Sequence, residues 1–309
     1  MISYRWRAAL DEDERAQVLA LVRAAAGYDA EAGFSTIDPH AVGERSDDPV
    51  RVAHLPIRAR RDLSIRADAP WVTVAYLNLV VDAEGLGTVR FVVHPDYRSR
   101  GIATLLVEEL GLDTSPAGGW AGTGARALRA WAYGSHPAAE RLATRFGISV
   151  VERRWTLVRH LSGPWAVPLA EVDPGRAVPE SVPVRPGDEV AESAAVSPAS
   201  DGESLHGQGR VIAVRDSQGA VGAIRFDTEL VAHAEFRAAW IGGVAVAERA
   251  ADGDLGSALL GRALGEMRAA GAQLALVQID PRDERDVRMW RLQWFEQEDA
   301  HVRYGVGAT

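Results

Sequence analysis

The segment from Val89 to Gly111, VRFVVHPDYRSRGIATLLVEELG, decides the fold of this chain. The apolar run that ends at Val93 predicts a strand, and Pro95 terminates it because proline cannot donate to a sheet ladder. From Ile102 onward the spacing predicts a helix that buries one apolar face and is capped by Gly111. An arginine-rich loop therefore joins a strand to the start of a helix.

This loop has the chemistry of an anion-binding cradle. The start of a helix presents backbone N–H groups without internal partners, and the aligned peptide dipoles make that end positive. Gly101 lets a phosphate approach the backbone, and Arg98 and Arg100 supply charges that pair with phosphate oxygens. Several converging donors suit a diphosphate. Taken alone, the loop is also compatible with a solvated turn that carries incidental arginines.

The composition limits the classes of function. A chain of 309 residues, 47% of them hydrophobic, is expected to form two packed domains. Its formal charge of −9 disfavours general nucleic-acid binding but allows one local basic pocket. Every Lys or Arg position is arginine, which excludes a Walker A lysine and a lysine Schiff base. The absence of cysteine excludes thiolate catalysis, thiolate metal sites and disulfides, and it fits a reducing compartment.

We expect a soluble cytoplasmic protein without membrane partners. The charged N-terminal helix does not resemble a signal peptide, and the apolar run at residues 71–81 is too short to cross a bilayer. The histidines lack paired metal-ligand spacing, so no metal site is expected. GTGARA, at residues 122–127, matches a dinucleotide fingerprint by letter, but it precedes a strand instead of following one, which argues against a nucleotide site.

Hydrophobic periodicity predicts two α/β halves. The first half opens with a helix whose buried face holds Val18, Leu21, Val22 and Ala25. A polar, loop-rich region follows it. The remaining predicted elements of this half are strands at 71–81 and 89–93, a helix at 102–110, a strand at 127–134, a helix at 136–147 and a closing strand at 148–161.

A proline-rich segment separates the halves. We place the first domain at residues 1–161, the linker at 162–183 and the second domain at 184–309. The acidic segment from 188 to 203 is expected to form a surface loop. Beyond it the order strand, strand, strand, helix, strand, helix repeats the order of the first half, which suggests a tandem duplication.

The cradle resembles motif A of the GNAT superfamily of acetyl-CoA-dependent N-acetyltransferases. That motif is Gln or Arg, two residues, Gly, one residue, and Gly or Ala, and it is matched by Arg98, Gly101 and Ala103 after VVHP. The tandem arrangement, WRAAL at residues 6–10 and the WAYG strand resemble more narrowly the two-domain mycothiol synthases of that superfamily. The resemblance implies a tandem GNAT fold of two mixed-sheet α/β (α+β) domains, with acetyl-CoA as cosubstrate and a small-molecule primary amine as acceptor.

The resemblance also implies which residues hold acetyl-CoA. The strand backbone would carry the pantetheine arm and acetyl group, as in strand addition, through Phe91, Val92 and Val93. A backbone N–H there could also stabilise the tetrahedral oxyanion. The diphosphate would be held by Ser99, Arg100, Gly101, Ile102, Ala103 and Thr104.

The second copy departs from this pattern, so we predict a degenerate, structural domain. At the cradle position it offers Asp252 and Asp254, which would repel a diphosphate. The tyrosine that many GNAT members use as an acid is matched by Ala143 in the first copy and Trp290 in the second. The glutamate that mycothiol synthases use as a base corresponds to Ala238.

Catalysis is therefore expected at the first cradle, with direct attack of an amine on the thioester. Asp82 and Glu84 are candidate bases in the turn before the strand, although turn carboxylates are usually only solvated. Tyr133 is the candidate acid, with a half-buried strand tyrosine as the alternative, and Trp131 is expected in the core. The competing function is a non-catalytic acetyl-CoA-binding or interaction protein of the same fold, because the acid and base positions are eroded.

Overall fold

A computed structural model describes residues 2–30, 34, 37–46, 50–60, 70–169, 209–217, 219–250 and 254–307. The chain forms two compact units. Unit 1 comprises residues 1–153 and 301–309, and unit 2 comprises residues 154–300. Unit 1 thus includes the C-terminal end of the chain, which the sequence assigns to the second domain.

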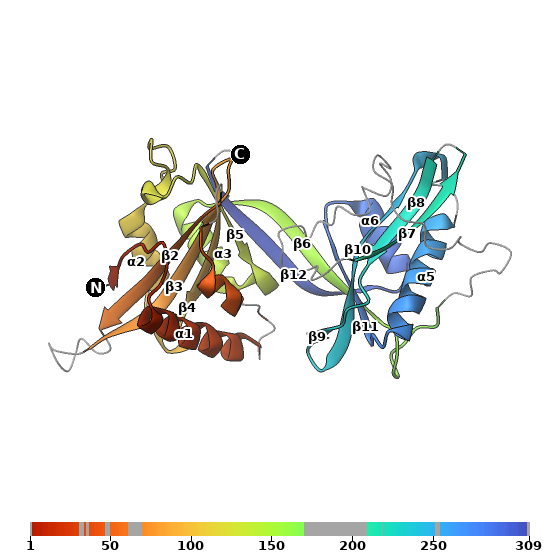
Figure 1. Ribbon diagram of the computed structural model, residues 1–309, viewed down its shortest axis with the longest axis horizontal. Coiled ribbons are helices and arrows are strands. Elements are labelled where there is room, and N and C mark those ends of the chain that lie inside the picture. The colour runs from red at the N-terminus through yellow and green to blue at the C-terminus, as the bar shows by residue number, and fades with distance from the viewer. Residues whose placement is uncertain are drawn as a thin grey trace. The chain divides into compact units, whose positions relative to one another are not determined.

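Unit 1 is built on a mixed sheet with the strand order β1-β2-β3-β4-β5-β12 (Figure 1). Neighbouring strands are antiparallel except β4 and β5, which run parallel. The strands are β1 (Ile2–Tyr4), β2 (Arg51–Arg60), β3 (Trp71–Val81), β4 (Leu86–Val93), β5 (Ala127–Ala132) and the end of β12 (Glu296–Val306). The helices are α1 (Glu12–Ala30), α2 (Ile102–Leu110) and α3 (Pro137–Phe146), with the 3-10 turns η1 (Pro39–Gly43), η2 (Pro95–Tyr97) and η4 (Tyr133–Ser135).

Helices cover both faces of this sheet because its strands alternate buried side chains between two cores. On one face Tyr76 and Val92 pack with α1. The predicted face of that helix is confirmed, since its four apolar residues are at most 2% exposed. On the other face Leu128 packs with Ile102 and Leu106 of α2. We call these the α1 face and the α2 face.

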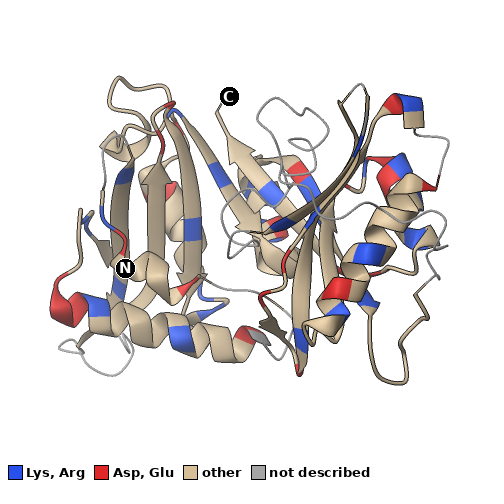
Figure 2. Cartoon of the chain, turned by 45° about the vertical axis from the view of Figure 1, so that its right-hand side comes forward, with Lys and Arg blue, Asp and Glu red and all other residues tan. Residues whose placement is uncertain are grey.

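Unit 2 has the strand order β6-β11-β10-β8-β7, with β9 paired to β10. Only β10 and β11 run parallel among these pairs. Acidic and basic residues are interspersed along the helices (Figure 2). The elements are β6 (Ser149–His160), β7 (Arg210–Asp216), β8 (Gly219–Phe226), β9 (Val231–His233), β10 (Phe236–Val246), η6 (Glu248–Ala250), α5 (Leu255–Ala269), β11 (Leu274–Ile279) and α6 (Glu284–Leu292).

The two units exchange strands. β6 follows α3 of unit 1, but its residues from Trp155 to His160 pair with β11 inside unit 2. β12 follows α6 of unit 2, but its residues from Val302 to Val306 pair with β5 inside unit 1. The strand predicted at 148–161 is present as β6, but its second half pairs inside unit 2. β12 is a strand that is not among the elements predicted from the sequence.

A second correction concerns β2, which lies in the region predicted to be loop-rich. Leu55 and Ile57 of this strand are fully buried. Pro56 is tolerated because the ladder with β1 ends at Ile57, and the next contact is the isolated bridge between Arg7 and His54. The proline therefore falls between two pairing sites. Predicted features at 170–208, including most of the linker and the acidic segment, lie outside the described residues. Within the described chain, no helix is long and apolar enough to cross a membrane.

Candidate functional site

The two parallel strands of unit 1 separate near the middle of the sheet. Their ladder ends at the pair Thr88 and Arg129, whereas β4 continues to Val93 and β5 continues to Ala132. The segment predicted to carry the pantetheine arm, residues 91–93, lies beyond the ladder. A strand edge that has left its neighbour can pair with an extended amide-containing ligand. We call the gap between the two strand ends the β4–β5 opening.

The loop after β4 leaves the start of α2 open. Gly101 caps the helix in the left-handed conformation, with φ of 75°, and no side chain caps the first turn. A Cβ at this position would have no protein atom within 4 Å. Packing therefore does not demand glycine here, but the left-handed backbone conformation favours it. The N–H groups of the first helical turn are left accessible to an anion.

The side chain of Arg98 holds this loop in place. Its guanidinium forms a two-point ion pair with Asp29, in which the Nη2–Oδ2 distance is 2.8 Å. Its Nε donates to the carbonyl oxygen of Val93 at 3.1 Å, and its Cζ lies 5.1 Å from the centre of the Tyr28 ring. The sequence predicts a phosphate contact for Arg98. In the structure the guanidinium of Arg98 instead bonds to Val93 at the end of β4 and to Asp29 in α1, which holds the loop against both elements.

Arg100 is the exposed cation of the loop. Its guanidinium lies 5.0 Å from the ring centre of Tyr97, in a cation–π contact. The preceding Ser99 has a positive φ of 60°, which turns the chain sharply before the helix. Ser99, Arg100 and Gly101 are all exposed, so a ligand can reach them from solution.

A polar network occupies the α1 face of β2, β3 and β4. Nη1 of Arg90 lies 3.1 Å from a carboxylate oxygen of Glu44 and donates to Oδ1 of Asn78 at 3.1 Å. The ring nitrogens of His54 lie 2.6 Å from the Tyr76 hydroxyl and 3.0 Å from the backbone oxygen of Glu44. His54, Tyr76 and Asn78 are fully buried. No local sequence pattern reveals this network, because its members are far apart in the chain.

The buried end of the network is neutral. Burial lowers the pKa of His54 and raises the pKa of Tyr76. The carbonyl oxygen of Glu44 can only accept, so we assign the proton of His54 to Nε2, and the Tyr76 hydroxyl donates to Nδ1. The charged end faces solvent, since the side chains of Glu44 and Arg90 are 37% and 23% exposed.

Two stacked aromatic side chains, Trp131 and Tyr133, lie at the end of β5. Trp131 lies on the α1 face, because side chains alternate along the strand and Leu128 faces α2. The guanidinium of Arg303 lies 5.6 Å from the Trp131 ring centre. The ring of Tyr133, the candidate acid, stacks on Trp131 at 6.1 Å and meets the edge of His301 at 5.5 Å. Trp131 was expected in the core and is half-buried.

The two candidate bases lie at the opposite end of β4. Asp82 accepts a hydrogen bond from the backbone N–H of Leu86 at 2.8 Å and so shapes the turn between β3 and β4. Glu84 is exposed in the same turn. Most of β4 stands between this turn and the cradle, at roughly 3.3 Å per residue. The structure therefore does not bring Asp82 or Glu84 together with the cradle residues.

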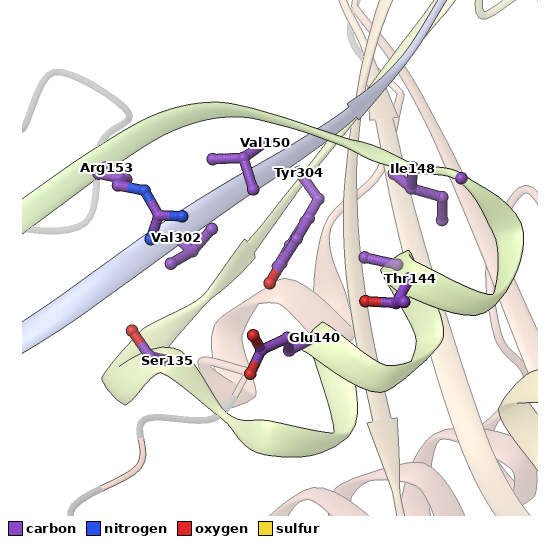
Figure 3. A pocket seen from close by; sticks show the side chains of 10 residues that line it. Ser135, Glu140, Thr144, Ile148, Val150, Arg153, Val302 and Tyr304 are labelled. Carbon is purple, nitrogen blue, oxygen red and sulfur yellow. The ribbon is translucent and has the colours of Figure 1, made fainter.

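A cavity of about 420 Å³ lies beside α3 in unit 1. Figure 3 shows the hydroxyl of Tyr304 pointing toward the carboxylate of Glu140, with Arg153 on the far side of the cavity. Burial and the negative charge of Glu140 raise the pKa of Tyr304. Ala143, which matches the family tyrosine, also lines the cavity. Its walls come from η4, α3, β6 and β12, so it is distinct from the cradle.

Unit 2 keeps the framework of the cradle but not its chemistry. η6 leads into α5 as η2 leads into α2, and Asp254 takes the capping position that Gly101 has in unit 1. Ala238 and Trp290 are buried. Asp252 lies outside the described residues. No group of three or more His, Asp or Glu side chains in the described parts of either unit is placed to hold a metal ion.

Sequence similarity to known proteins extends over most of the chain. A mycothiol acetyltransferase of Saccharomonospora viridis is 31% identical over 271 residues, which cover 78% of this chain and 81% of that relative. The chain belongs to the mycothiol acetyltransferase family. The mycothiol acetyltransferase of Stackebrandtia nassauensis is 27% identical over 310 residues and 94% of both chains. The match to the Salinispora arenicola enzyme, 35% identical over 156 residues, spans half of this chain and 44% of that relative.

Solved structures confirm the tandem GNAT fold of this mycothiol acetyltransferase family member. A tandem GNAT protein from the clavulanic acid biosynthesis pathway matches all of both chains at 16% identity, with a TM-score of 0.60. A GCN5-related N-acetyltransferase from Sphaerobacter thermophilus covers 98% of this chain and 95% of its own, at 18% identity and a TM-score of 0.58. No protein-family model matches the chain. The protein is an acetyltransferase of the GNAT fold.

Proposed function

We propose that the protein transfers the acetyl group of acetyl-CoA to the primary amine of a small molecule, and that unit 1 holds the acetyl-CoA. The observation that carries this proposal is the open, glycine-capped start of α2 beside the β4–β5 opening. The name of the relatives supports a small acceptor in the chemistry of mycothiol. A cytoplasmic location fits this role.

The residues present suit acetyl-CoA. Backbone N–H groups from Ser99 to Thr104 and the guanidinium of Arg100 would hold the diphosphate. The backbone of residues 91–93 would pair with the amide-containing pantetheine arm. An N–H of this strand would also face the thioester carbonyl, where it stabilises the charge that develops during acyl transfer. Asp254 gives unit 2 a carboxylate at the corresponding place, so we expect one bound acetyl-CoA per chain.

The test is the pair of substitutions Gly101→Asp and Gly111→Asp. Both glycines have positive φ, of 75° and 69°, and both leave open space around a new Cβ, but they lie at opposite ends of α2. Gly101→Asp should weaken acetyl-CoA binding by about 100-fold or more, which corresponds to roughly 3 kcal/mol. The new carboxylate stands where phosphate must meet the backbone. Calorimetry should give Gly111→Asp the affinity of the unmodified protein.

Three outcomes would count against the proposal. Equal affinity in folded Gly101→Asp would remove the assignment of the cradle. A stoichiometry of two would show that unit 2 also binds. Tight binding of acetyl-CoA without thiol release, across a wide panel of primary amines, would favour the non-catalytic acetyl-CoA-binding protein.

A further inference from the structure

The Glu44–Arg90 pair lies beside the β4–β5 opening. Thr88 and Arg129 form the last pair of the ladder, and Arg90 is the next residue of β4 on the α1 face. Trp131 is the next residue of β5 on the same face. Past the ladder, one wall of the opening therefore carries Arg90 with Glu44, and the other carries Trp131.

Buried polar groups fix the position of the Glu44 carboxylate. Asn78 lies opposite Arg90 in the ladder of β3 and β4 and accepts a hydrogen bond from it, while its own amide contacts the carbonyl oxygen of Ala41 in η1 at 3.4 Å. Nε2 of His54 donates a hydrogen bond to the backbone oxygen of Glu44 at 3.0 Å. Buried networks of this kind rigidify the groups that they hold. A carboxylate whose position is fixed in this way can meet a group of the ligand at a defined place.

The opening carries two groups that bind a cation, the Glu44 carboxylate and the Trp131 ring, beside the guanidinium groups of Arg90 and Arg303. Glu44 supplies a negative charge that solvent and ligands can reach, since its side chain is 37% exposed. Trp131 supplies an aromatic face, and Arg303 already occupies a cation–π position on that ring. A small molecule that carries an ammonium group is the ligand that this combination favours. The acceptor of an N-acetyltransferase arrives at neutral pH as such an ammonium.

We propose that Glu44 receives the ammonium group of the acceptor and removes its proton, and that Arg90 positions Glu44. This assignment rests on the proposed function. The first proton passes from the acceptor nitrogen to the Glu44 carboxylate, and the neutral nitrogen then attacks the thioester carbon. The C–N bond forms, the C–S bond breaks, and the second proton leaves the nitrogen for the departing sulfur. Glu44 returns its proton to water, so each turnover yields an amide, free CoA and one proton.

The substitution Glu44→Gln tests the assignment, because it preserves size and hydrogen bonding but cannot accept a proton. Thiol release from acetyl-CoA is measured with benzylamine, ethanolamine, glucosamine and glycinamide as acceptors. We expect kcat to fall by about 100-fold or more, the usual contribution of a general base. The affinity for acetyl-CoA, measured by calorimetry, should stay unchanged. Glu44→Asp should recover part of the rate.

Glu14→Gln is the matched control, because Glu14 is another carboxylate of unit 1 paired with an arginine, Arg7, at 2.9 Å. It should leave kcat unchanged. The split between kcat and the affinity for acetyl-CoA provides a readout that a structural role would not give: Glu44→Gln should lower kcat and leave that affinity unchanged, whereas a loss of structure would lower both.

The possible outcomes separate the two proposals. If the unmodified protein does not bind acetyl-CoA, the proposed function fails. If it binds acetyl-CoA and Glu44→Gln turns over as fast as Glu14→Gln, the base assignment is overturned and the pair is structural. Binding of acetyl-CoA by the unmodified protein, without thiol release from any of the four amines, also overturns the assignment of Glu44.

Discussion

Arg98 is the first residue of the cradle motif, yet its guanidinium is engaged by Asp29 at the end of α1. Asp29 is only 5% exposed, and Arg98 supplies the ionic partner of this buried carboxylate. The pair joins the loop before α2 to a helix that lies far from it in the sequence. In this chain Arg98 therefore sets the geometry of the loop before α2.

Asp29→Asn should destabilise unit 1 and loosen the cradle. The substitution leaves the guanidinium without its anionic partner. We expect a loss in the free energy of unfolding on the order of 2–3 kcal/mol, less than the ~3–5 kcal/mol of fully buried pairs, because the Arg98 side chain is partly exposed. Urea unfolding measures this loss. Asp96→Asn, in the same loop but at a highly exposed carboxylate, is the control and should be neutral. Equal stability of the two variants would contradict a bracing role for Arg98.

At the scale of secondary-structure elements, one polar network links the adjacent strands β2, β3 and β4 on the α1 face. Its buried histidine, His54, is neutral in the folded protein at neutral pH. The pKa of His54 is lowered below its ordinary value by burial. The unfolded chain therefore binds more protons at this site than the folded chain does at mildly acidic pH.

The stability of unit 1 should consequently fall as the pH drops below about 6.5, the ordinary pKa of histidine. Protonation of Nδ1 would also break its hydrogen bond with the Tyr76 hydroxyl. His54→Gln should flatten this dependence in unfolding experiments between about pH 7.5 and 5.5. His136 contributes in the same direction, since burial lowers its pKa too, so the loss should be reduced but not abolished.

His233 in unit 2 provides the opposite control. Its hydrogen bond with Glu298, at 2.7 Å, raises its pKa. This contribution to stability is present below about pH 6.5 and is lost as the pH rises through the folded-state pKa. His233→Gln should therefore remove stability mainly at low pH, whereas His54→Gln should change the slope in the other direction. Parallel pH profiles for the two variants would contradict both assignments.

At the scale of the whole molecule, neither half of the sequence is a complete folding unit. β5 pairs with the end of β12, which comes from the C-terminus, and β11 pairs with the end of β6, which comes from the first half. Each sheet thus needs a strand encoded in the other half. The second half of the sequence therefore supplies a strand to the sheet of unit 1, even though Asp254 replaces the cradle glycine in unit 2.

A fragment of residues 1–161 should therefore aggregate or unfold without cooperativity. It lacks the strand that covers β5, and it exposes apolar side chains whose burial is worth on the order of 1.5–3 kcal/mol each. The same fragment with residues 294–309 attached through a flexible linker should regain solubility and acetyl-CoA binding, because the added segment restores β12. Light scattering and calorimetry compare the two. A soluble fragment 1–161 that binds acetyl-CoA as tightly as the full chain would refute this role of β12.

The sequence alone determined the features that depend on local periodicity and spacing. The buried face of α1, the strand at 71–81 and the repeated order of elements follow from residues a few positions apart, so the tandem fold could be predicted. The cradle belongs to the same class, because a strand, a loop with Gly101 and a helix start are contiguous in the chain. The mycothiol acetyltransferase resemblance could be recognised for the same reason.

Only the tertiary structure decided which distant segments meet. Arg90 and Glu44 are 46 residues apart, and their pairing depends on how η1 packs over β4, which no local pattern encodes. The segment at 296–306 has no clear alternation, and it becomes a strand because β5 offers it an edge. Asp82 and Glu84 are close to β4 in sequence, but they lie at the end of this strand that is opposite the cradle. The summed contacts of the folded chain determine which distant segments pair with each other. Periodicity in the sequence indicates only which side of an element is buried.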